Sequence, residues 1–282
     1  MPSSQIPFDS VHQYLYVYAI MRIFTFKNLR ILILLLLLAV VANHVKDQKL
    51  VTQGWYKTLD IVIYPINPTG SPIVQRYINS LSDNNYSAID KFIKRESEKY
   101  GIVARIPTNT RLGQTLNVIP PAPPVPNGGP INALLWSLKL RWWIWQNAPQ
   151  EKHDKYLVRM FVLYHDPSQL NQLKHSVGLQ KGLVGIVNAF GVKSQNQQNN
   201  MVIAHEFLHT VGASDKYDAL GNPIIPEGLG DPNQSPLYPQ RFTEIMAGRR
   251  AISASHAKMP DSFKRIVIGI KTAQEIGWVS KL

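Results

Sequence analysis

The chain has 282 residues, 45% hydrophobic and 17% charged, which is enough for one full-sized globular domain with a modest appendage. It contains no cysteine, which excludes disulfides, a thiolate nucleophile and cysteine-based metal sites, so a metal must be held by His, Asp, Glu or water. The formal net charge of +12 favours anionic surroundings. Because the basic residues are scattered and form no nucleic-acid-reading motif, we expect no specific nucleic-acid partner.

The N-terminal region, residues 1–45, has the layout of an export signal. Three basic residues, Arg22, Lys27 and Arg30, precede an unbroken apolar run over residues 31–42. As a helix this run would be about 18 Å long, whereas a bilayer core of about 30 Å needs about 20 residues. The run is therefore short for a membrane-spanning helix and suits a signal peptide with a cleavage site at Val40-Val41-Ala42.

An uncleaved membrane anchor is the alternative interpretation, and Met21 is an alternative start of the chain. In both cases the basic flank stays inside, so residues 46–282 are exported to the periplasm or the extracellular space, or remain anchored to the membrane. We therefore expect association with a membrane or an anionic envelope surface.

Beyond residue 46 the pattern predicts one α/β domain. Apolar runs bounded by turn residues predict strands, which cover residues 59–64, 156–164 and 182–190. Helical patterns cover residues 71–99, in two pieces broken near 82–85, and residues 131–146 and 199–211.

Prolines mark two boundaries in this domain. Pro65 is expected to end the first strand, because it is followed directly by a turn sequence. Residues 119–130 hold six prolines and two glycines, which predicts an extended surface loop. The helix after this loop is rich in tryptophan, a composition typical of a core or of an interfacial aromatic belt.

The helix over residues 199–211 carries the candidate chemistry. His205 and His209 are four residues apart and therefore lie on one face, where both imidazoles can reach one metal ion. Glu206 lies about 100° round the helix from His205, beside the metal, and suits a general base. The opposite side of the helix is apolar and is expected to pack on the core; it consists of Ile203, Ala204, Phe207, Leu208 and Val211.

A catalytic zinc ion takes three protein ligands and a water, so two histidines leave one ligand missing. Gly212 can adopt the left-handed conformation that ends a helix, which lets the chain turn back. Asp215 then returns to the metal, and we expect its carboxylate to be the third ligand.

The segment from His205 to Asp215 resembles the signature of the metzincin zinc metalloproteases, His-Glu-x-x-His-x-x-Gly-x-x-(His/Asp), and its Asp form is similar to the snapalysin-type enzymes. The resemblance covers about residues 200–250 and extends to Tyr217 and to a Met-turn, for which Met246 is the candidate. It implies a metzincin-like α/β domain with a mixed twisted sheet. It also implies one catalytic zinc ion and hydrolysis of a protein or peptide substrate with Glu206 as general base.

Two other functions remain open at the level of the sequence. In a gluzincin-type peptidase Glu244 would be the third ligand instead of Asp215. In a non-catalytic envelope protein the zinc would be structural, although such a site has no use for a base at Glu206. Asp218 is a candidate partner for a ligand histidine.

The six other histidines have no partner at ligand spacing, and we assign them no role. They are His12, His44, His153, His165, His175 and His256. No Gly-x-Ser-x-Gly sequence is present, which excludes the common serine-hydrolase layout.

Overall fold

The computed structural model describes residues 26–124, 129–149 and 156–280, which form a mixed α/β structure preceded by an apolar helix. The chain divides into two compact units, Met1–Gln48 and Lys49–Leu282. This boundary lies three residues after the one expected from the sequence. His12 and His153 lie outside the described residues.

The apolar helix α2 (Phe26–Gly54) has 29 residues and is longer than the apolar run of the sequence. It is long and apolar enough to cross a membrane by length and composition, and a signal sequence would pass the same test. The helix is longer than the run because it continues through the polar residues on either side, so it fits both the signal peptide and the membrane anchor that the sequence predicts as alternatives.

The last residues of α2 and the residue after it belong to the second unit. Thr52 is buried there. The side-chain amide of Gln53 donates hydrogen bonds of 2.9 Å to the carbonyl oxygens of Val211 and Glu275. Trp55 donates its indole N–H to the carbonyl of Ile276 at 2.7 Å. Backbone carbonyls at helix ends have no intrahelical donor, so these side chains satisfy groups that burial would otherwise penalise.

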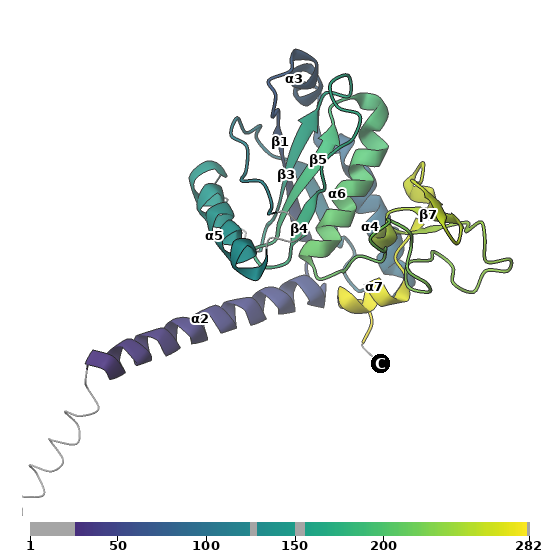
Figure 1. Cartoon of the computed structure of the whole chain (residues 1–282). Coiled ribbons are helices and arrows are strands. Elements are labelled where there is room, and N and C mark those ends of the chain that lie inside the picture. Colours follow the sequence, from purple (N-terminus) through teal and green to yellow (C-terminus); the bar gives the residue numbers. More distant parts are fainter. Residues whose placement is uncertain (1–25, 125–128, 150–155, 281–282) are drawn as a thin grey trace, which may run out of the picture. The chain divides into compact units, whose positions relative to one another are not determined.

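A five-stranded mixed sheet forms the centre of the second unit (Figure 1), in the order β2-β1-β3-β5-β4. Its strands are β1 (Leu59–Ile66), β2 (Thr108–Leu112), β3 (Val158–His165), β4 (Val177–Leu179) and β5 (Val184–Phe190). The first four in this order are parallel, and β4 pairs with β5 in the antiparallel direction at the edge of the sheet. The central strands are continuous apolar runs, as expected where both faces of a parallel sheet are covered.

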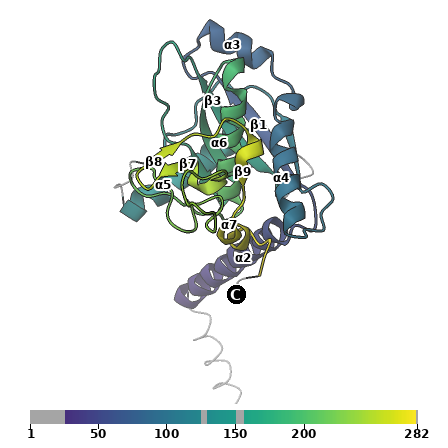
Figure 2. The same ribbon diagram turned by 90° about the vertical axis from the view of Figure 1, so that its right-hand side faces the viewer.

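Helices cover the two faces of this sheet (Figures 1 and 2). One face packs against α3 (Pro72–Asn79), α4 (Ser87–Lys99) and α6 (Asn196–Thr210) in the main core. The other face packs against α5 (Gly129–Asn147) in a smaller core. Successive strand residues alternate between the two, so that Met160 joins the first core and Phe161 the second.

Pro65 does not end β1, contrary to expectation. The strand continues through it, and Pro65 pairs with Val162 on β3. Its carbonyl accepts a hydrogen bond from Leu116 on the other side, where β2 has already ended at Leu112. The missing N–H of proline therefore faces a part of the sheet that needs no regular ladder, which is where strand prolines are tolerated.

The residues after α6 form short elements joined by long turns. They are the 3-10 turns η3 (Ile245–Ala247) and η4 (Phe263–Arg265), the strands β6 (Thr243–Glu244), β7 (Arg250–Ser253), β8 (His256–Lys258) and β9 (Ile266–Val267), and the helix α7 (Ile270–Glu275). In Figure 1 this segment lies on the side of α6 away from the sheet.

Most of the predicted elements are confirmed, including the break between α3 and α4. The helix α5 begins at Gly129 rather than at Ile131, because proline is compatible with the first helical turn. The strands β2 and β4 were missed, since both are short edge strands with little apolar patterning. The mixed α/β class and the apolar N-terminal helix are confirmed.

Candidate metal centre

The helix α6 presents two different sides, as its sequence predicts. Ile203, Ala204, Phe207, Leu208 and Val211 are fully buried in the main core. The histidine side chains lie on the other side of the helix, where they line a cleft of about 660 Å³. The core therefore fixes the rotation of the helix and with it the direction of both imidazoles.

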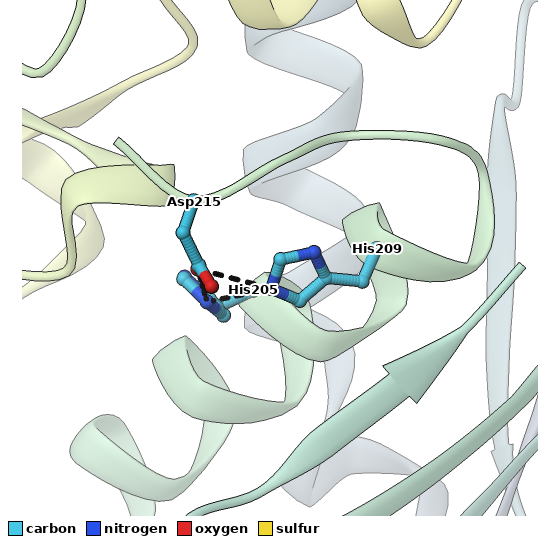
Figure 3. A group of neighbouring side chains, drawn as sticks. All are labelled: His205, His209 and Asp215. Atoms are coloured by element: carbon cyan, nitrogen blue, oxygen red, sulfur yellow. Dashed lines mark hydrogen bonds and ion pairs between the residues drawn. The ribbon is translucent and has the colours of Figure 1, made fainter. Parts of the chain in front are cut away.

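His205, His209 and Asp215 come together as one group that could hold a metal ion (Figure 3). The two histidine Nε2 atoms are 3.1 Å apart. Asp215 Oδ1 lies 3.1 Å from each of them. The sequence-based prediction that Asp215 returns to the two histidines is thus met by the geometry.

Each histidine is held by a backbone carbonyl on its far nitrogen. His205 Nδ1 lies 2.9 Å from the carbonyl oxygen of Ile245, and His209 Nδ1 lies 2.8 Å from that of Ala213. Because a carbonyl oxygen can only accept, each Nδ1 must donate, so each neutral imidazole presents a bare lone pair at Nε2. Such a partner orients a metal-binding imidazole and makes it more basic.

With both imidazoles neutral, three acceptor atoms therefore converge at 3.1 Å, which is unfavourable unless a metal cation or a proton on Nε2 lies between them. The titration of the group reflects this. Burial acts to lower the pKa of His205, but the hydrogen bond with Asp215 and the charge of Glu206 outweigh it and raise this pKa. Partial burial acts to raise the pKa of Asp215, but the hydrogen bonds from both histidines hold it well below its usual range.

Glu206 lines the same cleft and is itself buried. Its Oε2 atom has no hydrogen-bond partner among the described residues. Burial raises the pKa of Glu206, and the nearby histidines oppose that rise. A desolvated carboxylate with a free oxygen and a raised pKa has the properties of a general base.

Gly212 gives the chain the turn that the sequence predicts. It has φ +113° and follows Val211, the C-cap residue of α6. A Cβ atom here would lie 2.5 Å from the amide nitrogen of Gln53, which is itself held by two hydrogen bonds. Both the backbone conformation and the space therefore favour glycine.

A buried ion pair fixes the loop that carries Asp215. Lys216 is buried and binds Glu275 at 2.8 Å. The same carboxylate accepts hydrogen bonds from the backbone N–H and the hydroxyl of Ser214, at 2.9 and 2.8 Å. The two neighbours of Asp215 are thus tied to one side chain of α7. The sequence gives no sign of this pair, because its members are 59 residues apart.

The turn that contains Met246 lies beside the metal centre. Met246 is fully buried, and its carbonyl accepts a 2.9 Å hydrogen bond from the backbone N–H of Lys216. Gly248 ends the turn with φ +68°. The preceding residue, Ile245, provides the carbonyl that holds His205. The turn therefore supports both His205 and the loop that carries Asp215.

Glu244 does not reach the group of three. Its Oε2 atom accepts hydrogen bonds from the backbone N–H groups of Met246 and Ala247, at 2.5 and 3.0 Å. Its Oε1 atom accepts from the N–H of Gly269 and the hydroxyl of Thr272. With both oxygens engaged, this carboxylate stabilises the turn and α7, and the alternative in which it is the third ligand is not supported.

Tyr217 lies in the wall of the cleft, and its ring stacks at 6.5 Å on that of His205. Partial burial and the negative charge of Asp215 raise the pKa of Tyr217 to about 12. The phenol therefore keeps its proton at neutral pH and remains a hydrogen-bond donor beside the metal centre.

Asp218 is not a partner of either ligand histidine, contrary to expectation. Its carboxylate accepts hydrogen bonds from the backbone N–H groups of Leu220 and Asn222 and so shapes the following turn. The backbone carbonyls of Ile245 and Ala213 hold the two histidines instead, and side-chain patterns cannot reveal such partners.

His175, to which the sequence assigned no role, lies in the wall of the cleft. It comes from the residues just before β4, far from α6 in the sequence, so its spacing to the other histidines gave no signal.

The strand β4 forms a wall of the cleft, to which Val177 and Gly178 contribute. A Cβ atom at Gly178 would overlap the carbonyl oxygen of Glu206, so glycine is what allows the strand to lie against α6. No described strand pairs with the outer edge of β4.

Comparison with known protein families gives no matching family model, and comparison with curated proteins gives no match.

Proposed function

We propose that this chain is a zinc-dependent endopeptidase of the metzincin type, in which His205, His209 and Asp215 hold the metal. One observation carries the proposal: three acceptor atoms converge at 3.1 Å beside a buried carboxylate with a free oxygen, Glu206. Ligand atoms about 2.0–2.1 Å from a tetrahedral ion are about 3.3 Å apart, which is close to this separation.

The donor set favours zinc. Two imidazole nitrogens and one carboxylate oxygen suit zinc, whereas calcium and magnesium prefer oxygen alone. Three protein ligands leave a fourth position open, which distinguishes catalytic zinc sites from structural ones. When bound, zinc would supply a Lewis acid that polarises a carbonyl group and lowers the pKa of a water molecule to about 7.

The chain's own residues then have defined roles in hydrolysis. Glu206 takes a proton from the attacking water and delivers it to the amine of the departing peptide. Its raised pKa matches this double role better than that of an exposed glutamate would. Tyr217 donates a hydrogen bond from its phenol O–H to the oxyanion that develops on the substrate carbonyl.

The edge strand β4 supports a peptide as substrate. An exposed strand edge offers unpaired backbone N–H and C=O groups, and an extended peptide binds to it by adding a strand. Because β4 also lines the cleft of Glu206, a peptide bound along it would pass over the metal centre.

The apolar helix α2 supports export or membrane anchoring of this activity. Its 18-residue window of mean hydropathy 2.1 suits both a signal sequence and an anchor. In either case the peptidase unit would act outside the cytoplasm, because the basic residues before the apolar run favour the inner side.

Metal analysis of purified variants tests the ligand set. Full-length protein, purified in mild detergent and dialysed against low zinc, should hold one zinc ion per chain. Asp215→Ala should lose stoichiometric zinc, whereas the carboxylate variant Asp218→Asn should retain it. Retention of stoichiometric zinc by Asp215→Ala would overturn the assignment of the third ligand.

A peptide-library digest, read by mass spectrometry with and without chelator, tests the activity. Glu206→Gln should keep its zinc and lose at least about 100-fold in hydrolysis, the usual contribution of a general base. If zinc-loaded wild-type protein cleaves nothing, the metal is structural and the chain is a binding protein instead.

A further inference from the structure

The helix α5 carries large apolar residues on two opposite sides, yet protein covers only one of them. Its buried residues are Leu140 and Trp143, and Trp143 packs edge-on against Phe161 of the sheet at 5.0 Å. The outer side also carries large apolar residues, each between 55% and 71% exposed: Ile131, Leu134, Leu135, Leu138, Trp142 and Trp145. A surface helix normally has one apolar side that faces the core and a polar side that faces water, so a second apolar side needs a partner of its own.

The exposed residues form one continuous face. At about 100° per residue, the six side chains fall within an arc of about 100°, directly opposite the buried side. Lys139 and Arg141 flank this arc, about 80° to either side of its centre. The 19 residues of α5 include no acidic residue.

A cationic pocket of about 280 Å³ lies between α5 and the sheet. Arg141, Arg159 and Lys181 line it, together with the apolar side chains of Leu140, Ile144 and Trp145, and none of the lining residues is acidic. The Nε atom of Arg159 is buried and has no hydrogen-bond partner among the described residues. A phosphate oxygen would satisfy this donor.

We propose that α5 is an interfacial membrane-binding helix, whose apolar face enters the outer part of a bilayer while the pocket of Arg141, Arg159 and Lys181 binds an anionic phospholipid headgroup. Trp142 and Trp145 have the amphipathic ring that favours the membrane interface. The flanking cations can extend toward the headgroups while their stems cover apolar surface. The inference does not depend on the hydrolase activity.

Three features favour lipid over a protein partner. Tryptophan at one end of an apolar face and cations on both flanks are the composition of helices that lie in the membrane interface. The cationic pocket adjoins that face at Trp145, as a lipid with its headgroup and acyl chains together would require. The same chain carries α2, which is long and apolar enough for a membrane.

Site-specific fluorescence can test this, because the chain has no cysteine and a single introduced one is labelled alone. One variant is Leu138→Cys, on the apolar face. The control is Leu220→Cys, which replaces another exposed leucine on the loop after Tyr217. Each cysteine receives a polarity-sensitive NBD probe. The full-length variants are reconstituted into vesicles with 30% phosphatidylglycerol. The probe at position 138 should emit at shorter wavelength and be quenched by spin-labelled acyl chains, and the probe at 220 should do neither.

Two outcomes would overturn the membrane assignment. Equal emission from both probes means that α5 stays in water. A shifted emission at 138 that lipid quenchers do not reach means that protein covers the face, from a second copy or from the N-terminal residues of the chain.

The headgroup pocket has its own test in the same vesicles. Arg141→Gln and Lys181→Gln should each lower the partition of the 138 probe into the lipid about fivefold, the expected effect of one cation near an anionic surface. Replacing the anionic vesicles by neutral phosphatidylcholine vesicles should also lower the partition of the 138 probe into the lipid. Full insertion into neutral vesicles, unaffected by either variant, would overturn the role of the pocket.

Discussion

The helices α5 and α6 pack on opposite faces of the same sheet and differ in what they present on their outer sides. Both bury apolar side chains against the strands, such as Trp143 from α5 and Phe207 from α6. The outer side of α6 brings two histidines and a glutamate into a cleft, whereas the outer side of α5 is apolar and faces solvent. Burial against the sheet thus fixes both helices, and the function of each depends on its other side.

The largest effect is expected from the two sides of α5. Trp143→Ala should lower the free energy of unfolding by about 3–5 kcal/mol, the usual cost of deleting a buried tryptophan. Trp145→Ala should change it by no more than about 0.5 kcal/mol, because its side chain is 64% exposed. Urea unfolding followed by far-UV circular dichroism measures both, and equal costs would mean that the outer side of α5 is covered in the free protein.

The support of the metal centre on the outer side of α6 gives the next effect. Glu275→Gln should weaken zinc binding about 10- to 100-fold, because it loosens Ser214 and Lys216 on either side of Asp215. Competition with a chelating dye measures the affinity, and Glu227→Gln, an exposed glutamate of the same segment, is the control. Unchanged affinity in a folded Glu275→Gln protein would mean that Asp215 does not need this pair.

The end of α6 gives the smallest effect. Gly212→Ala should cost about 1–2 kcal/mol through its positive φ alone, and the fixed amide of Gln53 adds crowding. Gly70→Ala is the matched control, since Gly70 has φ +68° but no heavy atom within 4 Å of the added Cβ. Thermal unfolding should rank Gly212→Ala below Gly70→Ala, and the reverse order would mean that the turn after α6 relaxes without cost.

The metal-binding part of the centre could be predicted because its spacing is local. His205 and His209 lie one turn apart on a helix, and Gly212 allows the chain to turn back toward them with Asp215. The short stretch from His205 to Asp215 therefore defines the whole group. The main helices and central strands could be predicted for a similar reason, since each one carries its own apolar period.

The partners of that centre could not be predicted, because they are brought together from distant parts of the chain. Ile245 holds His205 through a backbone carbonyl that any residue type could provide, and Glu275 holds the loop of Asp215 across 61 residues. Glu244 and Asp218 looked suitable as a ligand and as a ligand's partner, but nearby backbone N–H groups engage both carboxylates.

The sequence by itself determined the residues of the candidate metal group, the apolar N-terminal helix and the mixed α/β class, because these follow from residue type and short-range periodicity. Only the tertiary structure decided which side of α5 is exposed, which backbone carbonyls hold the histidines and where the edge strand β4 lies. These depend on packing between segments far apart in the chain, and the free energy of that packing is not contained in any single stretch of residues.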